Sequence, residues 1–264
     1  MLTIKNYVRP QTLDEAYALA QKKSNVVLGG MLWLKMQNRN VNTAIDLCDL
    51  GLDTVTRQED GWHIGAMVSL RALETHEALN AQTQGAFREA LKHIVGVQFR
   101  NCATLGGSLY GRFGFSDVLT LLEVLDARVV LHHAGNLSIR EFAQLPRQTR
   151  DILVEVILPA KPMQVCYLSQ RNTATDFPTL ACALSRIDGR ITCSVGARPG
   201  RAVIFEDETG ILSRGITEKS ARAFGEDVAR RAVFGSNMRA GAEYRQKVCA
   251  VLVRRAALAL KEAE

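Results

Sequence analysis

The stretch NCATLGGSLYGRFGFSD, from Asn101 to Asp117, decides how the chain is interpreted. It contains a Thr-Leu-Gly-Gly step, and it ends in a Ser-Asp pair that leads into a long apolar helical pattern. An earlier stretch, VVLGGMLWL from Val26 to Leu34, contains the same Leu-Gly-Gly step. The chain therefore has two similar glycine bends far apart in the sequence.

Glycine accepts positive φ angles and lets a ligand come within contact distance of the backbone amides. Successive exposed N–H groups form a concavity that binds anions. Two such bends could hold opposite sides of one pyrophosphate. Neither bend has the Lys and Ser/Thr of a P-loop, and neither reads G-x-G-x-x-G, so phosphoryl transfer and a Rossmann site are disfavoured. The glycines alone leave a second interpretation open, which is two ordinary turns.

The composition is that of a soluble globular protein, with 264 residues, 47% hydrophobic and 23% charged. No apolar run approaches the roughly 20 residues of a membrane span. The N-terminal MLTIKNYVRP lacks the apolar core of a signal peptide, which predicts a cytoplasmic protein.

The net charge of +6 is concentrated near the C-terminus, where residues 214–264 hold 11 Lys/Arg against 6 Asp/Glu. These basic residues are spread along helical stretches and do not form a stripe with aromatic residues. The pattern favours a solvated helix face, or a surface that meets an acidic partner subunit, over nucleic-acid binding.

Side chains that could do chemistry by themselves are not evident in the sequence. The six cysteines, at 48, 102, 166, 182, 193 and 249, form no C-x-x-C pair and do not cluster with histidines. Reduced, mostly buried thiols are expected, and neither an iron–sulfur nor a zinc site is predicted. No catalytic residue and no metal ligand is predicted, which is informative because a bound cofactor could supply the reactivity.

The hydrophobic patterns predict an α+β chain. A helix is expected at 12–23, with Thr12 and Glu15 as a capping box, and another at 83–95. Ser116 is placed to cap a helix that starts at Asp117, and the last fifty residues read as helical. A break is expected near Pro159 and Pro162. Strands are predicted at 25–30, 42–47, 61–67, 128–133, 151–158, 164–170, 180–187 and 190–197.

In this order, the motifs resemble the FAD-binding (medium) subunit of the xanthine dehydrogenase and carbon monoxide dehydrogenase family of molybdenum hydroxylases. The resemblance runs nearly end to end. The segments that carry it are YVRPQTLDEAYALA, VVLGGMLWL, AIDLCDL, HIGAMVSL, VQFRNCATLGGSLYGRFGFSDVLTLLEVLDARVVL, DILVEVILP and NMRAGAEYRQKVCAVLVRRAAL.

The resemblance implies a two-subdomain α/β FAD-binding module of the PCMH/vanillyl-alcohol-oxidase-like type. This module would span residues 1–159, with a break near 50–55, and a C-terminal sheet-and-helix domain would span 160–264. It also implies partners, namely a molybdenum-binding large subunit and an iron–sulfur small subunit that carries [2Fe–2S] clusters. NAD is a possible acceptor, and neither nucleic acid nor a membrane span is expected.

The family resemblance also implies how FAD is held. The first bend would wrap the diphosphate with backbone amides, and the second would close on the same region. Ser116 and Asp117 would bind the adenosine and ribityl side, Ile94 would pack near the flavin and Leu153 would line the adenine. Tyr167 and Leu168 would approach the isoalloxazine. The implied cofactor-binding set is Val27, Leu28, Gly29, Gly30, Met31, Leu32, Ile94, Ala103, Thr104, Gly106, Gly107, Ser108, Gly111, Ser116, Asp117, Leu153, Tyr167 and Leu168.

The chain departs from the family pattern at the bends themselves. The usual A-G-G-T-[DE] is replaced by Leu28 to Leu32, so a hydroxyl becomes the thioether of Met31 and an acid becomes Leu32. The usual Gly-Gly-Asn ends in Ser108. Arg112 lies in a stretch that is small and polar in the family, where it would either meet phosphate or be a surface charge.

Three functions remain open at this point. The leading hypothesis is an electron-transfer flavoprotein subunit that passes electrons from partner clusters through FAD to NAD⁺, a quinone or another acceptor. The second is a flavin-free scaffold or assembly subunit with an eroded FAD site. A free-standing FAD oxidoreductase is less favoured, because no substrate site is recognisable.

Overall fold

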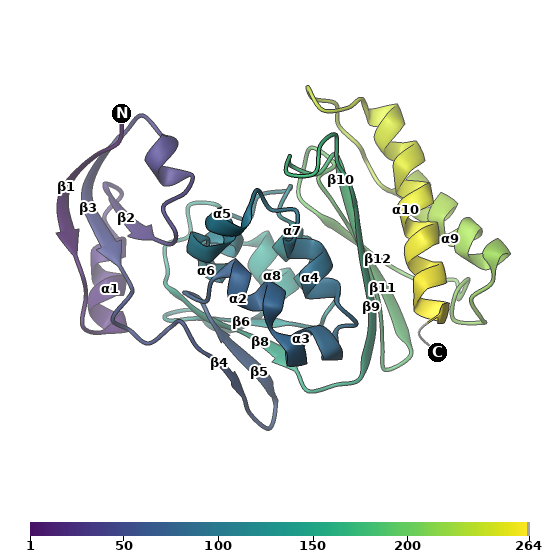
Figure 1. Cartoon of the computed structure of the whole chain (residues 1–264), viewed down its shortest axis with the longest axis horizontal. Helices are drawn as coiled ribbons and strands as arrows, with labels where there is room; N and C mark the ends of the chain where they lie inside the picture. The colour runs from purple at the N-terminus through teal and green to yellow at the C-terminus, as the bar shows by residue number, and fades with distance from the viewer. Residues whose placement is uncertain (263–264) are drawn as a thin grey trace. The chain divides into compact units, whose positions relative to one another are not determined.

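The computed structural model describes residues 1–262 (Figure 1), and the chain forms two compact units. Unit 1 comprises Met1–Ala72, Val97–Gly111 and Asp126–Ala160, whereas unit 2 comprises Leu73–Gly96, Arg112–Leu125 and the chain from Lys161 onward. The last of these boundaries lies between Ala160 and Lys161, and the expected division into domains at Pro159–Pro162 stays a prediction. Unit 2 also takes two earlier segments, which the expected 1–159 module would have contained.

Unit 1 begins with a parallel sheet of three strands in the order β1 (Thr3–Val8), β3 (Asn40–Asp46) and β2 (Asn25–Leu28). Helix α1 (Leu13–Ala20) packs on this sheet through Ala16 and Ala20, which share a buried cluster with Ile45. Thr12 caps α1 by accepting a bond from the Glu15 amide, as predicted. The other half of the capping box differs, because the Glu15 carboxylate accepts from the Gln11 amide instead.

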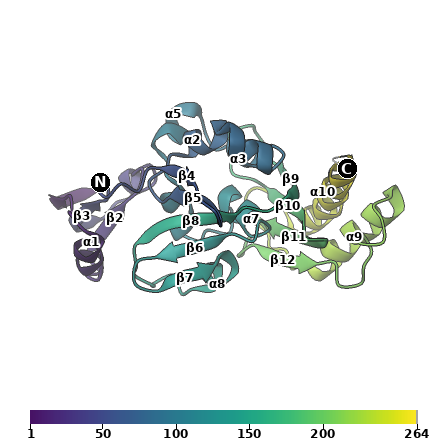
Figure 2. The same ribbon diagram turned by 90° about the horizontal axis from the view of Figure 1, so that it is seen from below.

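A five-stranded antiparallel sheet forms the rest of the unit 1 framework, in the order β4 (Val55–Arg57), β5 (Gly61–Gly65), β8 (Leu153–Pro159), β6 (Arg128–Leu131) and β7 (Gly135–Ser138). The chain passes from the first sheet to the second between β3 and β4. The subdomain break near 50–55 stays a prediction. In Figure 2, β8, β6 and β7 lie side by side with α8 (Ile139–Gln144) next to β7. Helices α5 (Val97–Cys102) and α6 (Leu105–Tyr110) also belong to this unit, and α2 (Leu70–Thr75) begins in it.

Unit 2 is built on an antiparallel sheet in the order β12 (Val203–Glu206), β11 (Arg190–Gly196), β10 (Leu180–Ile187) and β9 (Met163–Gln170). Helices α9 (Glu218–Arg231) and α10 (Ala242–Glu262) cover one face, and α4 (Ala86–Leu91) and α7 (Asp117–Leu122) cover the other (Figure 1). Helix α3 (Glu77–Gln82) precedes α4.

Strand β11 shows why both faces of this sheet are buried. Its residues alternate, so that Cys193 joins the apolar cluster under α9 and α10, whereas the Ser194 hydroxyl donates to Glu123, directly after α7, at 2.7 Å. On β10, the Ser185 hydroxyl donates to the carbonyl of Val124 at 2.5 Å. The face toward α7 is therefore joined by buried polar bonds, and the face toward α10 is apolar.

The expected α+β fold is confirmed, and each predicted strand appears. The sequence patterns missed β1, β4, β7 and β12 because these strands contain few buried apolar residues. They also missed several six-residue helices, which span too few residues for periodicity to show. The six cysteines are free as expected; three are buried, while Cys48 and Cys102 are exposed. In residues 1–262 no helix combines the length and apolar character that a membrane crossing requires. The cytoplasmic location stays a prediction.

Candidate cofactor site

The predicted site residues lie in both units. Unit 1 contains the two glycine bends, Gly111 and Leu153, and unit 2 contains Ile94, Ser116, Asp117, Tyr167 and Leu168.

The first bend follows directly from β2, the edge strand of the parallel sheet, which ends at Leu28. Among the described residues, the amides of positions 29 to 32 donate no hydrogen bond to the protein. Met31 has a left-handed backbone with φ 58°, and its carbonyl accepts from the Lys35 amide at 2.9 Å. Successive amides around a left-handed residue can converge on an anion. The first bend therefore offers a set of backbone donors suited to a diphosphate.

The second bend is already hydrogen-bonded within unit 1. The Leu105 amide donates to Val68 at 2.9 Å and the Gly106 amide to Ala66 at 2.7 Å. The Gly107 amide donates to the Thr104 hydroxyl at 3.1 Å, and the Ser108 amide donates to the Thr104 carbonyl at 3.0 Å. These four donors start α6 and join it to residues 66–68, so they are already engaged within the chain, and a contact of the second bend with the pyrophosphate stays a prediction.

The two bends touch one another, which gives the second bend a different role. A Cβ on Gly29 would lie 2.9 Å from the Thr104 hydroxyl and 3.2 Å from the Gly107 Cα. A Cβ on Gly30 would lie 2.0 Å from the carbonyl oxygen of Cys102, at the end of α5. The second bend packs directly against Gly29 and Gly30 and thereby restricts the backbone of the first bend. Ala103 and Thr104 are buried there, and Gly107 is exposed.

In unit 2, the side chains of Ser116 and Asp117 are engaged within the chain. The Ser116 hydroxyl accepts from the Leu119 amide at 3.1 Å and caps α7, as predicted. Asp117 is buried and accepts from Arg171 at 2.5 Å and from the hydroxyl of Tyr167. Burial raises the pKa of Asp117, while Arg171 and Tyr167 act in the opposite direction. Burial, followed by the nearby Asp117, raises the pKa of Tyr167 well above its usual value.

Arg171 was not among the predicted site residues, although it holds this cluster together. Its guanidinium also donates to the Ser169 hydroxyl at 3.2 Å and to the Asp176 carbonyl at 2.5 Å. Only 7% of its side chain is exposed. No local pattern distinguishes Arg171 from the other basic residues, since its acidic partner lies 54 positions earlier in the chain.

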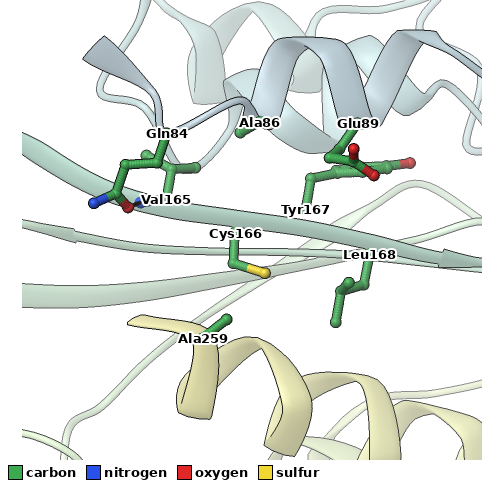
Figure 3. A pocket seen from close by; sticks show the side chains of 8 residues that line it. All are labelled: Gln84, Ala86, Glu89, Val165, Cys166, Tyr167, Leu168 and Ala259. Carbon is green, nitrogen blue, oxygen red and sulfur yellow. Dashed lines mark hydrogen bonds between the residues drawn. The ribbon is translucent and has the colours of Figure 1, made fainter. Parts of the chain in front are cut away.

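Tyr167 and Leu168 lie in the wall of a cavity of about 410 Å³ along the edge strand β9 (Figure 3). Figure 3 shows Tyr167 and Val165 pointing toward α4, and Cys166 and Leu168 pointing toward α10. Adjacent strand residues face opposite sides of a sheet, so the structure separates the two side chains that were expected at one ring. The lining is completed by Gln84, Ala86, Glu89 and Ala259.

The remaining predicted positions are less informative. Leu153 is buried at the start of β8, Ile94 is half-buried after α4, and Gly111 follows α6. Arg112 is only 2% exposed and has φ 44°, so the surface-charge alternative is wrong. No group of three His, Cys, Asp or Glu residues in the described chain could hold a metal ion.

Comparison with known proteins agrees with this organisation. A family model described as the FAD binding domain in molybdopterin dehydrogenase matches residues 2–161. YgfM of Escherichia coli (strain K12) is 28% identical over 193 residues, covering 70% of this chain and 72% of YgfM. The carbon monoxide dehydrogenase medium chain of Afipia carboxidovorans is 27% identical, covering 95% of this chain and 94% of that one.

Among solved structures, carbon monoxide dehydrogenase from Hydrogenophaga pseudoflava, in a form lacking the Mo-pyranopterin moiety, matches with a TM-score of 0.87. The match covers 97% of both chains at 21% identity, and it supports the fold alone. The expected class, an oxidoreductase subunit of this kind, is confirmed. The chain belongs to the family of FAD binding domains of molybdopterin dehydrogenases.

Proposed function

We propose that the chain holds FAD by its diphosphate at the first bend and serves as the electron-transfer flavoprotein subunit of a molybdenum hydroxylase. The observation that carries the proposal is the set of amides at residues 29 to 32, which donate to no described residue, on a bend fixed by Gly29 and Gly30. FAD would supply the redox chemistry, accepting and releasing electrons while the protein holds it in place.

The side chains of the first bend contribute little to this grip. Met31 offers a thioether and Leu32 a hydrocarbon, so neither donates a hydrogen bond to phosphate. Each missing bond to a charged group costs about 1.5–3 kcal/mol. Leu32 replaces the acidic residue that is usual at this position, so the bend has no carboxylate that would repel the phosphates. Backbone donation is therefore the main source of affinity at this bend.

The first test is the visible spectrum of the purified chain, alone and with its native partner subunits, followed by release and identification of the chromophore. We expect one FAD per chain. Gly30→Ala drives a methyl group into the Cys102 carbonyl and should lower FAD affinity at least a hundredfold. Gly241→Ala is the matched control, because its Cβ meets nothing within 4 Å. Circular dichroism of both variants separates loss of the bend from loss of the fold.

The acceptor and partners belong to the same proposal. Electrons would come from [2Fe–2S] clusters in a small partner and a molybdenum centre in a large partner, and leave to NAD⁺, a quinone or another acceptor. Anaerobic addition of NADH tests the NAD⁺ alternative, since a pyridine-nucleotide site should permit bleaching of the flavin. A flavin that stays oxidised with NADH but is reduced by a quinol would point to the quinone.

A flavin-free scaffold is the second candidate, and two observations favour it. The glycines are explained by packing alone, and two apolar side chains occupy the bend. A folded, colourless chain that assembles with its partners yet takes up no added FAD would establish the scaffold and exclude the flavoprotein.

A further inference from the structure

Trp33 is the residue directly after the candidate diphosphate bend, and it leads into the short 3₁₀ helix η1 (Leu34–Met36). Consecutive Cα atoms are about 3.8 Å apart, so its indole lies within roughly 10 Å of the Leu32 amide. The two planar rings of FAD are each linked to the diphosphate through a sugar or ribityl chain. A ring of a cofactor held at this bend can therefore reach Trp33.

Phe99 supports the indole from one side. The two ring centroids are 5.4 Å apart, with the planes tilted by 59°. Phe99 lies on α5, the helix that ends at Cys102, whose carbonyl oxygen bounds Gly30. The element that fixes the bend thus also orients Trp33.

Much of the indole surface is exposed to solvent. Trp33 is 45% exposed, Met36 on η1 is 72% exposed and Val97 on α5 is 43% exposed. Exposed apolar groups on the two elements that carry Trp33 and Phe99 are typical of a surface that a ligand covers. Lys35, also exposed, adds a positive charge on the same short helix.

We propose that Trp33, backed by Phe99, stacks on one of the planar rings of FAD and supplies affinity that Met31 and Leu32 cannot. The inference rests on the proposed flavoprotein function. Indole is the strongest stacking side chain for heteroaromatic rings, and such stacking needs no hydrogen-bond donor. The chain would thus recognise FAD by backbone amides at the diphosphate and by an aromatic side chain next to it.

The chain contains only two tryptophans, which makes a direct test possible. The full-length apoprotein is titrated with FAD, and the emission of the bound flavin is recorded. Trp33→Leu should weaken FAD binding tenfold or more, while Trp33→Phe should keep most of the affinity. A flavin stacked on indole loses most of its emission, so Trp33→Leu should also restore that emission if the isoalloxazine is the stacked ring. Trp62→Leu is the control, because Trp62 lies on β5 beside Arg57 and should change neither quantity.

A second titration identifies which ring is involved. ADP carries the adenine and the diphosphate and does not absorb at the wavelength of tryptophan emission. If ADP quenches the emission of the Trp62→Leu protein, in which Trp33 is the remaining tryptophan, the adenine lies on Trp33. If ADP leaves the tryptophan emission unchanged and the flavin emission of bound FAD is quenched, the isoalloxazine lies on Trp33.

The outcomes separate the inference from the proposed function. If FAD binds equally to wild type and Trp33→Leu, with unchanged flavin emission and no quenching by ADP, the stacking role is wrong and the flavin site stands. If the wild-type chain with its partners binds no FAD, both are wrong. The wild-type emission needs no variant, so a folding defect in Trp33→Leu would not obscure the result.

Discussion

Glycine at position 30 is required by backbone packing before any ligand is considered. A Cβ there would be 2.0 Å from the Cys102 carbonyl oxygen, and one at Gly29 would crowd Thr104 and Gly107. Glycine identity alone therefore does not distinguish a cofactor bend from a structural turn. What distinguishes them is where the amides go, since those of 29 to 32 have no partner in the described chain whereas those of 105 to 108 do.

Met31 has a left-handed backbone, at φ 58°, in which an L side chain crowds its own carbonyl. A left-handed backbone costs a non-glycine residue about 1–2 kcal/mol. Replacing that residue with glycine removes this cost, but glycine loses more conformational entropy on folding, which cancels part of the gain. We expect Met31→Gly to raise the free energy of unfolding by about 0.5–1 kcal/mol in urea titrations. Met36→Gly, in the following 3₁₀ helix, should lower it; an equal effect of both substitutions would contradict the role of φ.

The Asp117–Arg171 pair should be important for stability, because each side chain is only 7% exposed. Asp117→Asn keeps the shape but leaves the Arg171 charge buried without its counter-ion. Breaking such a pair costs about 3 kcal/mol, so chemical denaturation should show a loss of that size. The exposed pair of Arg9 and Asp49 is the control, and Asp49→Asn should change stability little. A small loss at both sites would contradict the assigned role of Asp117.

At the scale of elements, His63 on β5 joins two neighbouring parts of the five-stranded sheet. Its Nδ1 lies 3.0 Å from Glu155 on β8, and its Nε2 lies 2.8 Å from Asp60 in the β4–β5 turn. Burial disfavours the charged ring, but the hydrogen bonds and charges of Asp60 and Glu155 outweigh it, so the pKa of His63 is raised above 6.5. The protonated ring therefore stabilises this part of the sheet.

This contribution is present below pH 6.5 and is lost as the pH rises through the higher pKa of the folded protein. We expect the free energy of unfolding to fall from about pH 6 to pH 8 more steeply in wild type than in His63→Asn.

His93 is the opposite case, because burial, Arg171 and Lys92 lower its pKa. Because the folded protein disfavours protonation of His93, its free energy of unfolding decreases as the pH falls through this range. His93→Asn should therefore change the pH dependence of the unfolding free energy in the direction opposite to His63→Asn. Parallel curves for all three proteins would contradict both assignments.

At the scale of the whole molecule, the two units are interleaved along the chain. Unit 2 needs α4 and α7, which come from residues before 126, to cover β9, β10 and β11. Buried polar bonds such as Ser194 to Glu123 and Ser185 to Val124 depend on those helices. A cut at Ala160 therefore separates the sheet from half of its cover.

A fragment starting at Lys161 should consequently fail to fold by itself. It keeps the cluster under α9 and α10 but exposes the opposite face, with Thr192 and Ser194 unshielded. We expect narrow amide dispersion in NMR spectra and no cooperative thermal transition, in contrast to the full chain. A native-like circular dichroism spectrum with a sharp melt would show that α4 and α7 are dispensable.

The sequence by itself determined the α+β class, the long strands, the caps at Thr12 and Ser116, and the positions of the two bends. These features depend on periodicity and on residue types a few positions apart, which a linear pattern records. The tertiary structure decided that the first bend has amides to offer and the second does not, that Arg171 neutralises Asp117, and that Phe99 supports Trp33. Except for the two bonds that Thr104 accepts from Gly107 and Ser108, these features depend on contacts between residues far apart in sequence, and no local pattern encodes which distant group satisfies a given donor or charge.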